Sequence, residues 1–265
     1  MRRILLAALV SQVALVIAVI CLTSTDARTE VEFYNLPDRG DQYSLDVSKK
    51  LVDFLETNGI FRESEAVAGS GEDWLVLQRR YGDISLISAQ STLTKKQTVS
   101  YAGPEQDVEL SFLGISSPIF AITNVAGVKP GRVTTLFCQP RRNGSAFLSD
   151  EEMKTGYKRS FKLNENWYTL RVSRGQTQTG RTIGLLVLEG NGTMQLIARN
   201  LYQPDFGEII GNLLWAGDLD GDGKLDLYFD HYNEKGSLGT GLYLSSHADE
   251  GKLVKLVATF STLGC

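Results

Sequence analysis

Short runs of apolar and β-branched residues, separated by Gly, Pro, Ser and Asn, recur along most of the chain and restrict it to a β-rich fold. Runs of this length and composition are typical of strands, and the 26 glycines fit the many turns that such strands need. The predicted strands are Trp74–Leu77, Ile84–Ile87, Val108–Leu113, Ile119–Val125, Val133–Cys138, Trp167–Val172, Ile183–Leu188, Met194–Ala198, Leu213–Ala216, Leu225–Phe229, Gly241–Leu244 and Leu253–Phe260.

One segment follows a helical rather than a strand period. In residues 45–58, Val47, Leu51, Phe54 and Leu55 have the spacing of one helix face, and an Asn-Gly pair follows as a stop signal. We therefore expect a helix at 45–58, packed against the strands.

A second, shorter helix signal marks the predicted division of the chain. Ser149 and Glu152 form a capping box, and Gly156 is a typical helix end. We place the boundary there, between an N-terminal β-rich region, residues 28–148, and a C-terminal antiparallel β module, residues 149–265. The predicted fold class is thus α+β, with short antiparallel strands and one or two helices.

Within the C-terminal module, one connection is specified by its turn residues. The sequence Glu189-Gly190-Asn191-Gly192 separates two of the predicted strands. Asn-Gly pairs favour the two-residue turns that join antiparallel neighbours. We therefore predict a tight hairpin there.

The first 27 residues have the pattern of a secretory signal peptide. Arg2 and Arg3 precede an apolar stretch, Ile4–Leu22, and small residues lead to a cleavage position after Ala27. This pattern predicts a secreted or periplasmic bacterial protein.

Two membrane-bound alternatives remain for the same segment. Residues 4–22 are long enough to serve as an uncleaved anchor. Alternatively, Cys21 is the lipidated cysteine of a lipoprotein, although Ile20 is larger than the residue such signals place before the cysteine. Contact with a membrane is expected only in these two cases.

Removal of this leader would leave two cysteines, Cys138 and Cys265. In an oxidising compartment, an even pair is most simply one disulfide, which would tie the C-terminus to the predicted strand containing Cys138. The alternative is two unpaired thiols.

The residues that most directly indicate chemistry are Asp218-Leu-Asp220-Gly-Asp222-Gly223-Lys224-Leu-Asp226. Carboxylates on alternate residues supply the inward-facing oxygens that Ca²⁺ requires, Gly223 permits a sharp turn, and Lys224 offers its carbonyl. Without a cation, these carboxylates would repel one another. The sequence therefore predicts a Ca²⁺ loop over 218–226, with Asp218, Asp220, Asp222, Asp226 and the Lys224 carbonyl as ligands.

This loop resembles the calcium loops of FG-GAP and VCBS-type repeat families. It does not follow the EF-hand pattern, because Phe229 stands where an EF-hand has its bidentate Glu and a predicted strand follows in place of a helix. Those families build β-propellers from several repeats, whereas this chain has one copy of the loop, so a complete propeller is not expected. The resemblance implies the ion site. The wider C-terminal stretch, from Leu214-Trp215 through His231-Tyr232-Asn233 and Leu242–Ser246 to Cys265, resembles uncharacterised exported bacterial proteins with a lone calcium loop, and this second resemblance implies an exported protein.

Other function classes lack support in the sequence. The formal net charge of -4 argues against nucleic acid as a partner, and the two histidines lack the spacing of a zinc enzyme. Trp74, Trp167 and Trp215 lie in apolar strands and are expected in the core instead of on a sugar-stacking face.

The resulting hypothesis is an exported protein with a structural Ca²⁺, acting by binding an unidentified protein or glycan partner. No catalytic motif is recognisable, so a non-enzymatic role is favoured. The alternative is a secreted or periplasmic hydrolase braced by the same ion. A pocket with converging titratable groups would distinguish the two.

Overall fold

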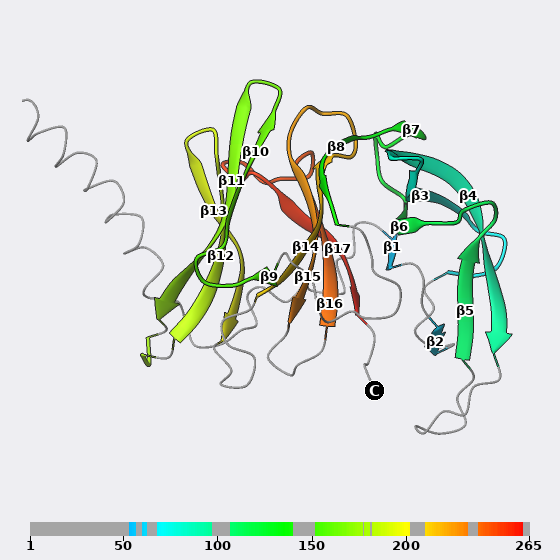
Figure 1. The fold of residues 1–265 in the computed structure, drawn as a ribbon, viewed down its shortest axis with the longest axis horizontal. Coiled ribbons are helices and arrows are strands. Elements are labelled where there is room, and N and C mark those ends of the chain that lie inside the picture. Colours follow the sequence, from blue (N-terminus) through cyan, green and yellow to red (C-terminus); the bar gives the residue numbers. More distant parts are fainter. Residues whose placement is uncertain are drawn as a thin grey trace, which may run out of the picture.

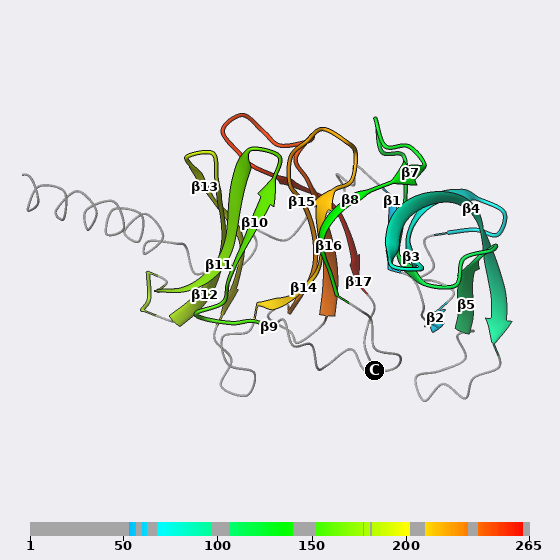
Figure 2. The ribbon, with the colours of Figure 1, turned by 45° about the horizontal axis from the view of Figure 1, so that its top comes forward.

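The computed structural model describes residues 53–56, 60–62, 68–96, 107–139, 152–176, 178–180, 182–201, 210–232 and 238–261. Within these ranges, the regular elements are β-strands in three sheets, and all their pairings are antiparallel. The three sheets lie side by side as layers (Figures 1 and 2). The prediction of a β-rich antiparallel protein is confirmed.

The first sheet has the strand order β1-β6-β3-β4-β5-β2, with β7 added beside β4. Its longest strand, β4, pairs with β3 over its first half and with β5 over its second half, and it curves strongly between them (Figure 2). The bounds are β1 Asp53–Glu56, β2 Ile60–Arg62, β3 Asp73–Arg80, β4 Asp83–Lys96, β5 Asp107–Phe112, β6 Pro118–Thr123 and β7 Gly131–Arg132.

The second sheet is a meander of four strands in the order β10-β11-β12-β13. Its strand β12 is buried on both faces: Leu186 and Leu188 belong to the core shared with the third sheet, while Leu185 and Val187 form a smaller cluster with Ile183. The bounds are β10 Lys158–Leu163, β11 Asn166–Gln176, β12 Thr182–Gly190 and β13 Thr193–Leu201.

The third sheet lies between the other two and has the order β17-β16-β15-β14-β8, with β9 also paired to β14 (Figure 1). Its bounds are β8 Thr134–Cys138, β9 Glu152–Met153, β14 Gly211–Asp218, β15 Asp226–Tyr232, β16 Leu238–Leu244 and β17 Lys255–Ser261.

Both faces of this central sheet are covered, which explains its nearly continuous apolar sequence. Consecutive side chains of a strand point to opposite faces. Tyr228 therefore packs in the core shared with the first sheet, where its ring centroid lies 5.0 Å from that of Phe120, while Leu227 and Phe229 pack in the core shared with the second sheet. The loop after β14 is thus anchored in the most buried layer of the molecule.

The prediction of a helix at 45–58 is wrong for residues 53–56, which form strand β1 paired with β6. A short apolar pattern does not by itself distinguish a helix from a strand. Here, the β6 main chain offers hydrogen-bond partners to four consecutive residues. The rest of the predicted helix lies outside the described residues.

The second helix prediction is also wrong where the structure describes it. Glu152 and Met153 form β9, and Gly156 lies in a turn with a φ of 90°. Met153 is fully buried and pairs with Gly211 of β14. This burial outweighs a local capping signal. Ser149 lies outside the described residues.

The strand predictions are confirmed: all twelve of the predicted runs fall within or overlap an observed strand. The hairpin prediction is confirmed too, because β12 and β13 are joined by Asn191 and Gly192, whose φ values of 52° and 74° are both positive, as the predicted two-residue turn requires.

The predicted division at residues 148 and 149 stays a prediction, because residues 140–151 lie outside the described ranges. Strand β8, which precedes that point, nevertheless pairs with β14 of the third sheet. The leader at residues 1–27 also lies outside the described residues.

Candidate metal site

The acidic loop joins two neighbouring strands of the central sheet. Asp218 is the last residue of β14 and Asp226 is the first of β15, and their ends are fixed by the pairing of Gly217 with Asp226. Gly223 has a φ of 79°, in the left-handed region where a side chain is disfavoured. The predicted sharp turn at Gly223 is therefore present.

Three of the predicted ligands come together at this turn. Asp218, Asp220 and Asp222 each present a carboxylate oxygen within 4.8 Å of the other two. Their exposure increases along the loop, from buried Asp218 through intermediate Asp220 to exposed Asp222. This cluster can hold a metal ion.

Asp218 organises the loop around its carboxylate. Its Oδ1 accepts a hydrogen bond of 2.8 Å from the Gly221 N–H, and its Oδ2 accepts one of 2.9 Å from the Gly223 N–H. Burial raises the pKa of Asp218, and these two N–H groups oppose the rise. The main chain of the loop therefore surrounds the Asp218 carboxylate through contacts within the protein alone.

The next two aspartates repeat this local pattern on a smaller scale. Asp220 Oδ1 accepts from the Asp222 N–H at 3.2 Å, and Asp222 Oδ1 accepts from the Lys224 N–H at 2.8 Å. The other Asp220 oxygen, Oδ2, is buried without a hydrogen-bond partner. An unpartnered, buried carboxylate oxygen is costly unless an ion or water satisfies it.

Asp226, the fourth predicted aspartate ligand, is not one of the three clustered aspartates, and its side chain is fully buried. Its Oδ2 accepts from the Leu219 N–H at 2.8 Å, while its Oδ1 accepts from the N–H and the hydroxyl of Ser245, at 2.8 and 2.9 Å. Burial raises the pKa of Asp226 to about 8, against the opposing effect of these donors. The Asp226 carboxylate is therefore held in place by hydrogen bonds from three donors.

The donors around the loop are all uncharged. No lysine or arginine among the described residues forms an ion pair with any of the four aspartates. Lys224 is exposed, and its side chain does not neutralise the loop. Neutral N–H dipoles favour the ionised carboxylates but leave their net negative charge in place.

Two residues that contact the loop were missed by the sequence analysis. Ser245, immediately after β16, donates its hydroxyl towards Asp222 and Asp226, and Asn164, in the turn between β10 and β11, donates from Nδ2 to the Gly223 carbonyl at 3.1 Å. Both are distant in sequence from the aspartates they support, so no local motif could have identified them.

The tryptophan prediction is confirmed at two positions and wrong at the third. Trp74 and Trp215 are buried, but Trp167 is 61% exposed near the start of β11. The side chains of β11 alternate, so the burial of Tyr168 turns Trp167 outward, where the Lys162 ammonium lies 6.0 Å from its ring centroid.

The disulfide prediction stays a prediction, because Cys265 lies outside the described residues. Cys138 is half-buried in β8, and burial raises the pKa of its thiol, while the nearby Arg79 guanidinium acts in the opposite direction. Arg79 also donates to the Cys138 carbonyl at 2.7 Å.

Comparisons of the chain with family models, curated proteins and solved structures return no match. Among the described residues, none of the elements is a helix of the length and apolarity needed to cross a membrane.

Proposed function

We propose that this chain is a calcium-binding protein in which Ca²⁺ occupies loop 218–226 and stabilises the connection between β14 and β15. The observation that carries the proposal is the convergence of three aspartate oxygens within 4.8 Å of one another, while no basic side chain in the described part of the chain forms an ion pair with them. A cation is the simplest group that would make this arrangement favourable.

The chemistry of the donors supports a hard cation. The converging groups are carboxylates, with the Lys224 carbonyl also in the loop, and oxygen ligands of this kind suit Ca²⁺ or Mg²⁺. Ca²⁺ accepts a larger and more flexible oxygen shell than Mg²⁺, which requires a near-ideal octahedron. A loop of alternating aspartates fits the larger, flexible oxygen shell of Ca²⁺ better than the octahedron of Mg²⁺. We therefore propose Ca²⁺, with Asp226 and the Lys224 carbonyl completing the ligand set.

The expected role of the ion is structural. The loop connects two strands whose side chains fill the cores on both sides of the central sheet. An ion that binds only the folded loop stabilises the native state by mass action, by about 2.7 kcal/mol at a hundredfold excess over its dissociation constant. Metal binding would thus stabilise the central layer of the fold.

The biological setting is proposed on sequence grounds. The predicted leader and the resemblance of the C-terminal stretch to exported bacterial proteins with a lone calcium loop support an exported protein in a compartment where calcium is abundant. We propose that the folded protein acts by binding a protein or glycan partner.

No observation favours the hydrolase alternative. Such an enzyme would need two or more titratable groups converging on a pocket. An open hollow on the first sheet contains Asp73 as its one titratable lining residue; it is lined by Asp73, Trp74, Leu75, Ser88, Thr123, Asn124, Val125 and Ala126.

The test is a set of thermal melts of the full chain in EDTA, in added Ca²⁺ and in added Mg²⁺. We expect the melting temperature to rise with Ca²⁺, to rise less with Mg²⁺, and to lose its calcium response in the Asp220→Ala, Asp222→Ala double variant. The matched control is Asp73→Ala, Asp83→Ala, which removes two exposed aspartates of the first sheet. A wild-type protein that does not respond to Ca²⁺ would refute the proposal.

A further inference from the structure

A single hydroxyl lies between two of the loop's carboxylates. Ser245 Oγ is 3.1 Å from both oxygens of Asp222 and 2.9 Å from Oδ1 of Asp226. Ser245 is itself only 4% exposed, and its main-chain N–H also donates to Asp226. One residue of the turn after β16 therefore contacts two aspartates of the loop between β14 and β15.

The two carboxylates that Ser245 contacts differ in how firmly they are otherwise held. Asp226 is fully buried and accepts main-chain N–H groups on both of its oxygens. Asp222 is exposed, and Lys224 N–H on Oδ1 is its other donor among the described contacts. Without a further contact, an exposed carboxylate can adopt several rotamers, and binding a metal would cost the entropy of fixing one.

A proton count shows what the hydroxyl can do. A serine hydroxyl has one proton to donate and two lone pairs. It can therefore donate to Asp222 or to Asp226 at a given moment, while its lone pairs remain available on the other side. The hydroxyl therefore links the two side chains, because it lies within hydrogen-bond distance of both the Asp222 and the Asp226 carboxylates.

We propose that Ser245 is a positioning residue of the metal site, whose hydroxyl fixes Asp222 beside Asp226 and thereby sets the calcium affinity of loop 218–226. This inference rests on the proposed calcium binding and adds the residue that tunes it. Groups that hold metal ligands in place typically account for a 10- to 100-fold difference in metal affinity when they are removed.

The arrangement also connects the site to a third strand. Asp226 is at the start of β15 and Ser245 follows the end of β16, the strand next to it in the central sheet. Metal bound at the loop would therefore be supported by β14, β15 and β16 together. A displacement of the end of β16 would move Ser245 and so change the positions of the carboxylates that hold the ion.

Isothermal titration of Ca²⁺ into the metal-free full chain tests the inference, with wild type, Ser245→Ala, Ser245→Thr and Ser246→Ala compared. We expect Ser245→Ala to weaken calcium binding by about 10- to 100-fold. The threonine variant keeps the hydroxyl and should bind within about threefold of wild type, a residual cost from its added methyl. The matched control is Ser246, which is exposed and bonds to His247, away from the aspartates.

Melting each variant in EDTA separates positioning from folding. A purely structural role for Ser245 would lower the metal-free melting temperature of the alanine variant without a hydroxyl-dependent change in affinity. Unchanged affinity in Ser245→Ala, or equal losses in the alanine and threonine variants, would overturn the inference and leave calcium binding intact. Absence of calcium binding by wild type would overturn both proposals.

Discussion

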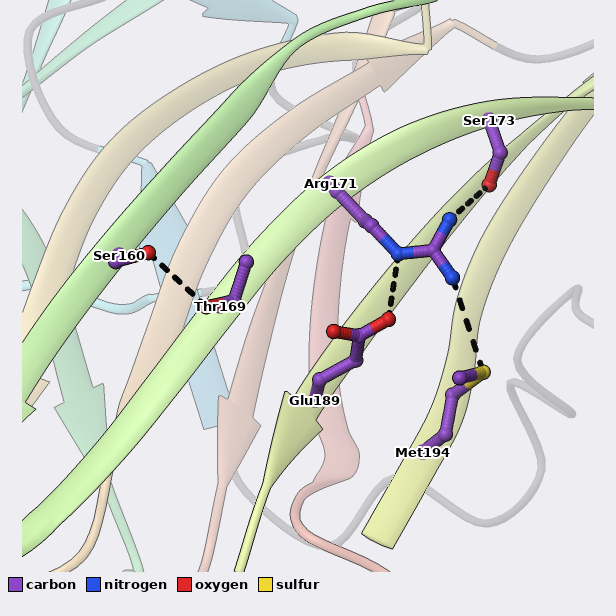
Figure 3. A network of polar contacts seen from close by, with 6 residues as sticks. All are labelled: Ser160, Thr169, Arg171, Ser173, Glu189 and Met194. Atoms are coloured by element: carbon purple, nitrogen blue, oxygen red, sulfur yellow. Dashed lines mark hydrogen bonds and ion pairs between the residues drawn. The ribbon is translucent and has the colours of Figure 1, made fainter. Parts of the chain in front are cut away.

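Acidic side chains are compensated in opposite ways in loop 218–226 and on the second sheet. On β11 and β12, Glu189 accepts a hydrogen bond from Arg171 Nε at 2.5 Å, and the same guanidinium contacts Ser173 Oγ at 2.8 Å and Met194 Sδ at 3.9 Å (Figure 3). In the loop, the donors to the four aspartates that the described residues supply are main-chain N–H groups and the Ser245 hydroxyl. The second sheet carries its own counter-charge, whereas no basic side chain among the described residues pairs with the loop aspartates.

This difference supports the proposal that the loop binds a cation, whereas the acidic group on the second sheet is already paired within the chain. A guanidinium supplies both a hydrogen bond and a full positive charge, so the half-buried pair on the sheet is neutral as a unit. Main-chain N–H groups orient the loop carboxylates but do not cancel their charge. Negative charge held in a fixed arrangement by neutral donors is the condition under which a cation binds most favourably.

The largest effect on the free energy of unfolding is expected for Asp226→Ala. The change leaves two buried N–H donors, of Leu219 and Ser245, without their acceptor, while the Ser245 hydroxyl can still donate to Asp222. We expect a loss of about 3 kcal/mol in the free energy of unfolding, even in EDTA, because unsatisfied buried donors are costly. Urea unfolding of the wild type and the variant in EDTA measures this loss. A loss below about 0.5 kcal/mol would show that water replaces the carboxylate without penalty.

Changing the pH should have the next largest effect, because protonation alters Asp226 without removing it. Burial raises the pKa of Asp226 to about 8 in the metal-free fold, above its value of about 4 in an unfolded chain. The unfolded chain then loses its proton first, so stability in EDTA should fall as pH rises from about 4 to about 8 and level off above that.

Saturating Ca²⁺ should reduce this fall, because the ion favours the ionised carboxylates in the folded state. Urea unfolding at a series of pH values, with and without Ca²⁺, checks both statements. If the free energy of unfolding in EDTA rose between pH 5 and pH 8, it would contradict the raised pKa of Asp226 in the metal-free fold.

Glu189→Gln tests the ion pair of the second sheet. It leaves the half-buried Arg171 without its counter-charge and should cost about 0.5–1 kcal/mol, the scale of a partly exposed ion pair. Because this pair is separate from the loop, the rise in melting temperature with Ca²⁺ should equal that of wild type. A reduced calcium response in Glu189→Gln would mean that the two regions are coupled.

The smallest expected effect is that of Asn164→Gly. Asn164 has a φ of 53°, which glycine adopts without strain, so the change mainly removes the exposed hydrogen bond to the Gly223 carbonyl. We expect calcium affinity to fall by about two- to threefold, which corresponds to about 0.5 kcal/mol. A tenfold loss by calorimetry would place Asn164 among the main supports of the loop.

The sequence predicted the elements whose signals are local. The Asn191-Gly192 turn, the sharp turn at Gly223 and the strands around them were all identified from neighbouring residues. The two helix predictions are wrong at the residues that the structure describes, because they also used local signals, at segments where pairing with β6 or β14 decides the conformation. Trp167 was misplaced because its run is apolar on average although its side chain faces outward.

The strand and turn signals of the sequence are enough to predict an antiparallel β fold and a loop whose aspartates alternate at the spacing of a metal site. The structure adds that Asp218, Asp220 and Asp222 converge while Asp226 is fully buried, and that Ser245 contacts both Asp222 and Asp226. Turn geometry depends on adjacent residues, whereas burial and contacts between strands depend on how three sheets pack against one another, and no local pattern records that packing.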